Sequence, residues 1–211
     1  MNNTLKTLWG IFAVSAVAIA SYVSNAPALV AIGSLVGIIF VISVAFQNKY
    51  ANFWGALCGL AFGYFSYTQG LFGNAIIQLG FVVPMSLYGM WLWWKRSESD
   101  DGLKRSLSAT DKRGIWFLSL TGLVVAMGFS YLSGATMPIM DAITTVLPVV
   151  GTFLLVNAYK EQWYIWLTYN SLQIAMWFVL ASAAPELLAL LVMRVVFLVN
   201  SVVGFCEWKG K

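Results

Sequence analysis

Long apolar blocks separated by short connections run along almost the whole chain. Each block is close to the ~20 residues that an α-helix needs to cross the ~30 Å hydrocarbon core of a bilayer, and none alternates polar and apolar residues as a barrel strand does. Because backbone polar groups in lipid must be satisfied within their own segment, the pattern predicts membrane-spanning helices. Eight are expected, at about 7–24, 28–46, 53–69, 75–94, 115–133, 139–157, 162–181 and 187–206.

Composition supports an all-α integral membrane protein. Of 211 residues, 60% are hydrophobic and 9% charged, too little charge to cover the surface of a soluble domain. The chain has no histidine, which removes the commonest metal ligand and general base. We find no phosphate-binding loop of the Walker type, no cluster of metal ligands, and no Ser or Cys paired with a base. We therefore expect no enzyme activity, no catalytic residue, no metal site and no cofactor.

The positive charges predict the orientation of the helices. If the loops are assigned alternately to the two sides, all Lys and Arg outside the apolar blocks fall on one side. These are Lys6, Lys49, six basic residues of the polar loop 95–114, Lys160, Lys209 and Lys211. By the positive-inside rule, both termini and this central loop are cytoplasmic.

The order of the blocks suggests an internal repeat. An N-terminal transmembrane helix (1–27) precedes a first triple-helix repeat (28–94), a cytoplasmic loop and linker helix (95–138) and a second triple-helix repeat (139–211). Lys49 and Lys160 each stand just before the second helix of a repeat. Corresponding helices of the two copies are four helices apart along the chain, so the copies run in the same direction. This 3+1+3 plan with parallel repeats is the one found in SWEET transporters.

Polar residues inside the apolar blocks are candidate ligand contacts, since a buried amide in lipid needs a partner. In 162–181, the side chains of Trp163, Trp166, Asn170 and Gln173 share one helical face. We expect this face to bind substrate. The alternative is an interfacial aromatic belt with interhelical hydrogen bonds, although the two amides lie deeper than a belt. Further candidates are Tyr64, Gln78, Tyr88, Trp91 and Asn200, with Asn48 and Asn52 either at a polar cytoplasmic mouth or in an ordinary solvated loop.

Two charged residues, Asp141 and Arg194, fall within the predicted spans. They could pair with each other, and a structural ion pair or an arginine reaching the outer surface is as compatible with the sequence as a substrate contact. Neither belongs to a series of carboxylates and histidines that would carry protons. The sequence therefore favours equilibrative transport over ion-driven pumping.

Three segments resemble the Pnu family of bacterial vitamin and nucleoside transporters. They are 48–55 with 70–74 and Gln78, 88–94, and 161–170 with its spacing of Trp163, Trp166 and Asn170. The resemblance implies a SWEET-like core, a homotrimer in the bacterial cytoplasmic (inner) membrane, and facilitated diffusion made one-way by a cytoplasmic kinase that phosphorylates the substrate. It also implies that Trp163, Trp166 and Asn170 contact substrate, with Gln78 a weaker match.

The leading functional hypothesis is facilitative uptake of a nucleoside-like vitamin, with nicotinamide riboside first among the substrates. Aromatic faces can stack on a flat heterocycle, and amides can satisfy ribose hydroxyls or a carboxamide. A deoxynucleoside or thiamine carrier of the same family is the alternative. A non-transporting membrane scaffold is a further one, and it predicts that the polar face of 162–181 packs against protein without a cavity.

Overall fold

The computed structural model describes residues 2–97 and 104–209, and the elements within these ranges are all helices. Lys211 and residues 98–103 of the central loop lie outside the described residues. The helices are α1 (Asn3–Val23), α2 (Ala28–Ala45), α3 (Ala51–Thr68), α4 (Phe72–Ile77), the π-helix η1 (Gln78–Val82), α5 (Val83–Ser97), α6 (Ala109–Leu132), α7 (Pro138–Val156), α8 (Gln162–Ala183), the 3₁₀ turn η2 (Pro185–Leu187) and α9 (Leu188–Lys209).

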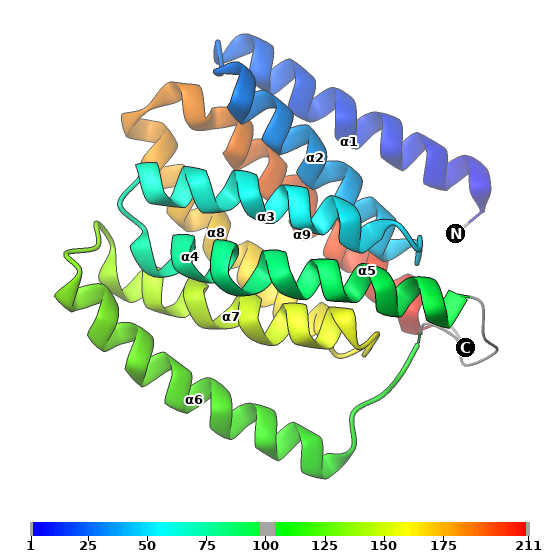
Figure 1. Cartoon of the computed structure of the whole chain (residues 1–211). Helices are drawn as coiled ribbons and strands as arrows, with labels where there is room; N and C mark the ends of the chain where they lie inside the picture. The colour runs from blue at the N-terminus through cyan, green and yellow to red at the C-terminus, as the bar shows by residue number, and fades with distance from the viewer. Residues whose placement is uncertain (1, 98–103, 210–211) are drawn as a thin grey trace.

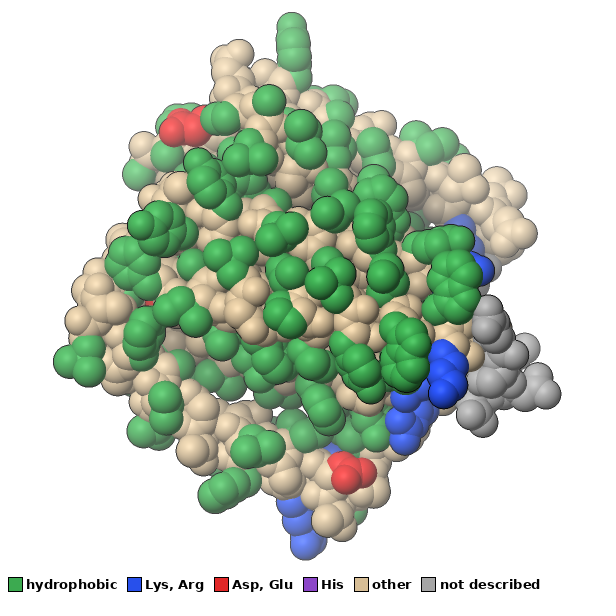
Figure 2. Space-filling view, viewed as in Figure 1, with side chains coloured by type: hydrophobic (Ala, Val, Ile, Leu, Met, Phe, Trp, Pro, Cys, Tyr) green, Lys and Arg blue, Asp and Glu red, His purple; other side chains and the backbone are tan. Residues whose placement is uncertain are grey.

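Six helical segments are long and apolar enough to cross a membrane: α1, α2, the continuous helix α4–η1–α5, α6, α7, and α9 with η2. The long helices α3 and α8 fall outside this group because polar side chains lower their hydropathy. The outer face of α6 presents Trp116, Phe117 and Val124 with about 70% of each residue exposed. Figure 2 shows hydrophobic side chains spread across the face it presents, with Lys and Arg gathered towards one end. Such a surface suits lipid and not water, so the chain is a multi-pass membrane protein.

Six helical rods form a closed ring. Following neighbours in contact, α2 packs on α3, α3 on α4–η1–α5, this helix on α7, α7 on α8, α8 on α9, and α9 on α2. Helix α1 packs outside the ring against α2 and α9, and α6 packs outside it, mainly against α7. Figure 1 shows α1 and α6 at opposite edges of the molecule and both termini at the same end. Any space enclosed by the ring is therefore independent of α1 and α6.

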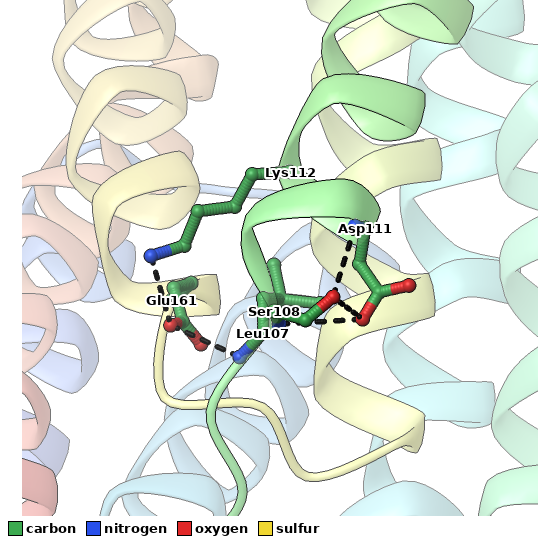
Figure 3. A network of polar contacts seen from close by, with 5 residues as sticks. All are labelled: Leu107, Ser108, Asp111, Lys112 and Glu161. Atoms are coloured by element: carbon green, nitrogen blue, oxygen red, sulfur yellow. Dashed lines mark hydrogen bonds and ion pairs between the residues drawn. The ribbon is translucent and has the colours of Figure 1, made fainter.

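The central loop is fixed to the second half of the chain where α6 begins (Figure 3). The hydroxyl of Ser108 accepts a hydrogen bond from the Asp111 amide at 3.1 Å, and the Ser108 amide donates to the Asp111 carboxylate, which together form a capping box. The Glu161 carboxylate accepts from the Leu107 amide at 3.1 Å and lies 3.8 Å from Lys112 Nζ. The cap explains why α6 starts at Ala109, several residues before the apolar block that the sequence marks.

Two apolar clusters fill the ring at its two ends. One joins α1, α2, α3, α8 and α9, with Phe62, Trp177 and Met193 among its buried members. The other lies near the end that carries the termini and is built around Trp93, Trp163 and Trp208. The indole of Trp208 stands edge-on to that of Trp163, with ring centroids 5.9 Å apart. The middle of the ring therefore lies between two clusters of packed side chains.

Candidate substrate cavity

An internal cavity lies between the two apolar clusters and is lined by residues of all six ring helices. Its free volume is about 70 Å³, well below the roughly 300–1,000 Å³ typical of pockets for small organic ligands. The lining side chains must therefore move outward before a small organic ligand of ordinary size can fit. The lining residues are Phe40, Val41, Val44, Gly55, Cys58, Gly59, Phe62, Gln78, Val82, Ser86, Pro148, Thr152, Leu155, Trp163, Trp166, Tyr169, Asn170, Arg194, Phe197, Asn200 and Ser201.

The two tryptophans of the α8 face are each seated against a glycine of a neighbouring helix. A Cβ atom at Gly204 of α9 would lie 2.2 Å from the Trp163 ring, and one at Gly151 of α7 would lie 2.9 Å from the Trp166 ring. Only a residue without a side chain allows the helices to approach the rings this closely. The two glycines thus leave the space in which the indoles of Trp163 and Trp166 pack at the cavity wall.

Several polar groups on the cavity wall have no hydrogen-bond partner among the described residues. Asn170 Nδ2 donates to Ser201 Oγ at 3.1 Å, which leaves Asn170 Oδ1 unpaired. Trp163 Nε1 and Arg194 Nε are unpaired as well. Buried polar groups normally have partners, and leaving one unmade costs about 1–3 kcal/mol. These groups can therefore donate to and accept from a polar ligand.

Gln78 reaches the cavity from a π-helical turn. In η1 the amide of Val83 donates to the Gln78 carbonyl five residues earlier, directly before Pro84, which has no amide hydrogen to donate. A proline at this point disrupts regular α-helical bonding, and a π-turn is a common local response at functional sites. The structure thus places the π-helical turn where Gln78 lines the cavity.

Asn200 lines the cavity but has both ends of its amide engaged. Its Nδ2 donates to the Val41 carbonyl at 2.8 Å, and its Oδ1 accepts from Trp9 Nε1 at 3.1 Å. It therefore links α9 to α2 and α1, and a substrate would have to compete with these bonds.

The other candidates from the sequence do not line the cavity. Gln173 is fully buried, and its Oε1 accepts from Trp177 Nε1 at 2.6 Å. Asn52 is also fully buried, packed against Gly89 of α5, with neither end of its amide paired among the described residues. The remaining four are exposed on the outside of the ring or in a turn: Asn48, Tyr64, Tyr88 and Trp91.

Asp141 and Arg194 do not pair with each other. The Asp141 carboxylate accepts hydrogen bonds from the amides of Gly73 and Asn74, at 3.1 and 3.0 Å, and from Ser130 Oγ at 2.9 Å. It therefore satisfies the free amides at the start of α4, where a negative charge is also favoured by the helix dipole. The Arg194 guanidinium lies over the Phe62 ring at 4.0 Å, inside the cavity wall and not at the surface.

Sequence reasoning missed the aromatic and small residues that complete the cavity. Phe40, Phe62 and Phe197 are apolar, and an apolar side chain of a membrane helix suits lipid as well as a cavity wall, so residue type does not mark them as internal. Tyr169 and Ser201 could have been found by their polarity, because each stands one helical turn or less from a predicted contact on its own helix.

A ring of membrane helices around a cavity of indoles, amides and unpaired polar groups defines the class as a membrane carrier for a small polar molecule. Comparison with known proteins identifies the family. The model of the nicotinamide mononucleotide transporter family matches residues 27–210. The chain belongs to this family, whose members are transporters and not enzymes.

Individual relatives agree with this assignment. The chain is 29% identical over 188 residues to the nicotinamide riboside transporter PnuC of Neisseria mucosa, covering 85% of this chain and 71% of that protein. It is 24% identical over 185 residues to PnuC of Haemophilus influenzae, covering 85% and 78%. The crystal structure of the vitamin B3 transporter PnuC superposes with a TM-score of 0.85 at 25% identity, over 99% of this chain and 92% of that one. The resemblance inferred from the sequence motifs is confirmed.

Proposed function

We propose that the protein is a facilitative transporter that takes up nicotinamide riboside across the cytoplasmic membrane. The observation that carries the proposal is the cavity in the helix ring that Trp163, Trp166 and Asn170 line together. The indole faces would stack on the pyridine ring, and the unpaired polar groups would bind the ribose and the carboxamide. Both relatives are named for this substrate. A scaffold would need no such cavity, so the scaffold alternative is disfavoured.

The proposed architecture has eight membrane-spanning helices, with α1 and α6 outside a core of two parallel three-helix repeats. Helices α2, α3 and α4–η1–α5 form one repeat and α7, α8 and α9 the other, in a 3+1+3 arrangement. The repeats meet along two seams of the ring, between α4–η1–α5 and α7 and between α9 and α2. The polarity of α3 and α8 is compatible with spanning, because their polar residues can face the ring interior.

Transport would proceed as the two repeats rock about the cavity and open it to one side at a time. The described Lys and Arg residues outside the cavity gather towards the end that carries both termini, so we place this end in the cytoplasm of a bacterium. A cytoplasmic kinase would trap the imported substrate by phosphorylation. The homotrimer expected for the family is retained as part of the proposal.

A deoxynucleoside or thiamine remains the alternative substrate, since a stacked heterocycle beside amides does not by itself identify the base. Calorimetric titration of the purified protein with nicotinamide riboside, thiamine, riboflavin, thymidine and deoxyuridine separates these cases. Nicotinamide riboside should bind at micromolar affinity or tighter. Tighter binding of one of the other four compounds would transfer the proposal to it, and no binding of any of the five by folded protein would refute it.

A further inference from the structure

Arg194 is the only charged residue among those that line the cavity, and it has no acidic partner in the described part of the chain. Only 3% of the residue is exposed, and its Nε has no hydrogen-bond partner among the described residues. The one buried acid within the described spans that could have neutralised it, Asp141, is engaged at the start of α4. The cavity therefore carries an uncompensated positive charge.

Aromatic rings hold the guanidinium without neutralising it. Its Cζ lies 4.0 Å from the ring centroid of Phe62, 5.3 Å from that of Tyr169 and 5.4 Å from that of Phe197. Such contacts stabilise a buried cation only in part, and a buried charge generally needs an opposite charge and full hydrogen bonding. The described residues supply no counter-charge, so we look for one in the ligand.

The charge stands close to the aromatic surface on which a heterocycle would stack. Tyr169 contacts both the indole of Trp166 and the guanidinium of Arg194. The centroid of its ring lies 5.9 Å from that of Trp166, edge to face, and 5.3 Å from Arg194 Cζ. A ligand heterocycle stacked on Trp166 would thus be separated from the Arg194 guanidinium by about the width of one side chain, that of Tyr169. Within a buried site of low dielectric, a fixed positive charge at that range repels a second one and attracts an anionic substituent.

We propose that Arg194 determines specificity by binding an acceptor-rich, anionic substituent of the heterocycle, and that the cavity prefers a riboside without net positive charge. The inference rests on the proposed function and refines its substrate class. Nicotinamide riboside carries a pyridinium and a neutral carboxamide. The riboside of pyridine-3-carboxylic acid has the same ring and sugar, but its carboxylate balances the pyridinium and can accept charge-assisted hydrogen bonds from a guanidinium.

The test compares the affinities of these two ribosides for the purified full-length protein by calorimetric titration. The wild type should bind the carboxylate riboside at least about tenfold more tightly, as expected for a charge-assisted hydrogen bond in place of a repulsive contact. Arg194→Lys should keep most of this preference, and Arg194→Gln should abolish it. Arg105→Gln serves as the matched control, because that arginine lies over Tyr159 outside the cavity.

A merely structural role for Arg194 would change stability or lower both affinities together, and would leave their ratio unaltered. If the wild type binds nicotinamide riboside as tightly as the carboxylate riboside, or more tightly, the inference is overturned and the proposed function stays intact. This comparison uses the wild type alone, so it does not depend on whether a variant folds. An unchanged ratio in a folded Arg194→Gln protein overturns it as well. If folded wild type binds neither riboside, the proposed function fails and the inference fails with it.

Discussion

Replacing Gly204 by alanine tests directly whether the close packing of Trp163 against this glycine positions the indole at the cavity wall. The added Cβ would lie 2.2, 2.4 and 2.5 Å from three atoms of the indole, which cannot bend away as a flexible side chain could. The ring is also held edge-on by Trp208. Either α9 moves away from α8, or the ring turns into a cavity of only about 70 Å³.

The expected size of the effect follows from two opposing contributions. Overpacking a closed interior costs about 1–3 kcal/mol, whereas alanine for glycine within a helix gains about 1 kcal/mol. We therefore expect Gly204→Ala to be less stable by up to about 2 kcal/mol, and riboside affinity to fall by the stacking contribution of one ring, ~0.5–1.5 kcal/mol. Thermal unfolding and calorimetric titration of the detergent-purified protein measure the two effects.

The matched control is Gly128→Ala in α6, where a Cβ would meet nothing within 4 Å. This variant should keep the wild-type affinity and gain up to about 1 kcal/mol of stability. The reasoning is refuted if Gly204→Ala behaves like Gly128→Ala in both measurements.

Three further predictions concern the cavity and its surroundings. Asn170→Ala should weaken riboside binding by about 1–3 kcal/mol, because a buried polar group of the ligand loses its partner; unaltered affinity in titration would remove Asn170 from the site. Trp91→Ala should leave affinity unchanged, since this indole is 56% exposed and faces away from the cavity; a loss comparable to that of Asn170→Ala would contradict the placement. Asp141→Asn should lower the melting temperature, because the start of α4 loses a charged acceptor worth ~0.5–2 kcal/mol. The ratio of the affinities for the two ribosides should stay as in the wild type. A shifted ratio would mean that Asp141 does influence the charge of the cavity.

The helices and their order could be predicted because apolar blocks of membrane-spanning length carry a strong signal. The ends of helices were less predictable, since polar capping residues such as Ser108 and Asp111 extend α6 into a segment that looks like loop. The left-handed backbone of Ala158, just after α7, also has no signature in its residue type. Boundaries therefore depend on local hydrogen bonds that hydropathy does not record.

The candidate site was predictable where polarity interrupts an apolar helix. Of the four residues predicted on the α8 face, Trp163, Trp166 and Asn170 line the cavity, and Gln173 is buried but does not line it. The same rule led to Tyr88 and Trp91, which face outward, because aromatic residues suit both a membrane interface and a binding site. Arg194 could be recognised as unusual from the sequence, but whether it met Asp141 or a ligand depended on how α9 packs in three dimensions.

The cavity wall also contains a thiol, Cys58 of α3, while the chain's other cysteine, Cys206, is exposed. With Cys206 replaced by serine, a small alkylating reagent could reach the remaining sulfur only during moments when the ring opens. The rate at which the protein gains the mass of the reagent would therefore report how often the ring opens, without any attached fluorophore or spin label. Because the adduct would fill much of the free space, transport should stop molecule by molecule as alkylation proceeds, and bound substrate should slow both events equally.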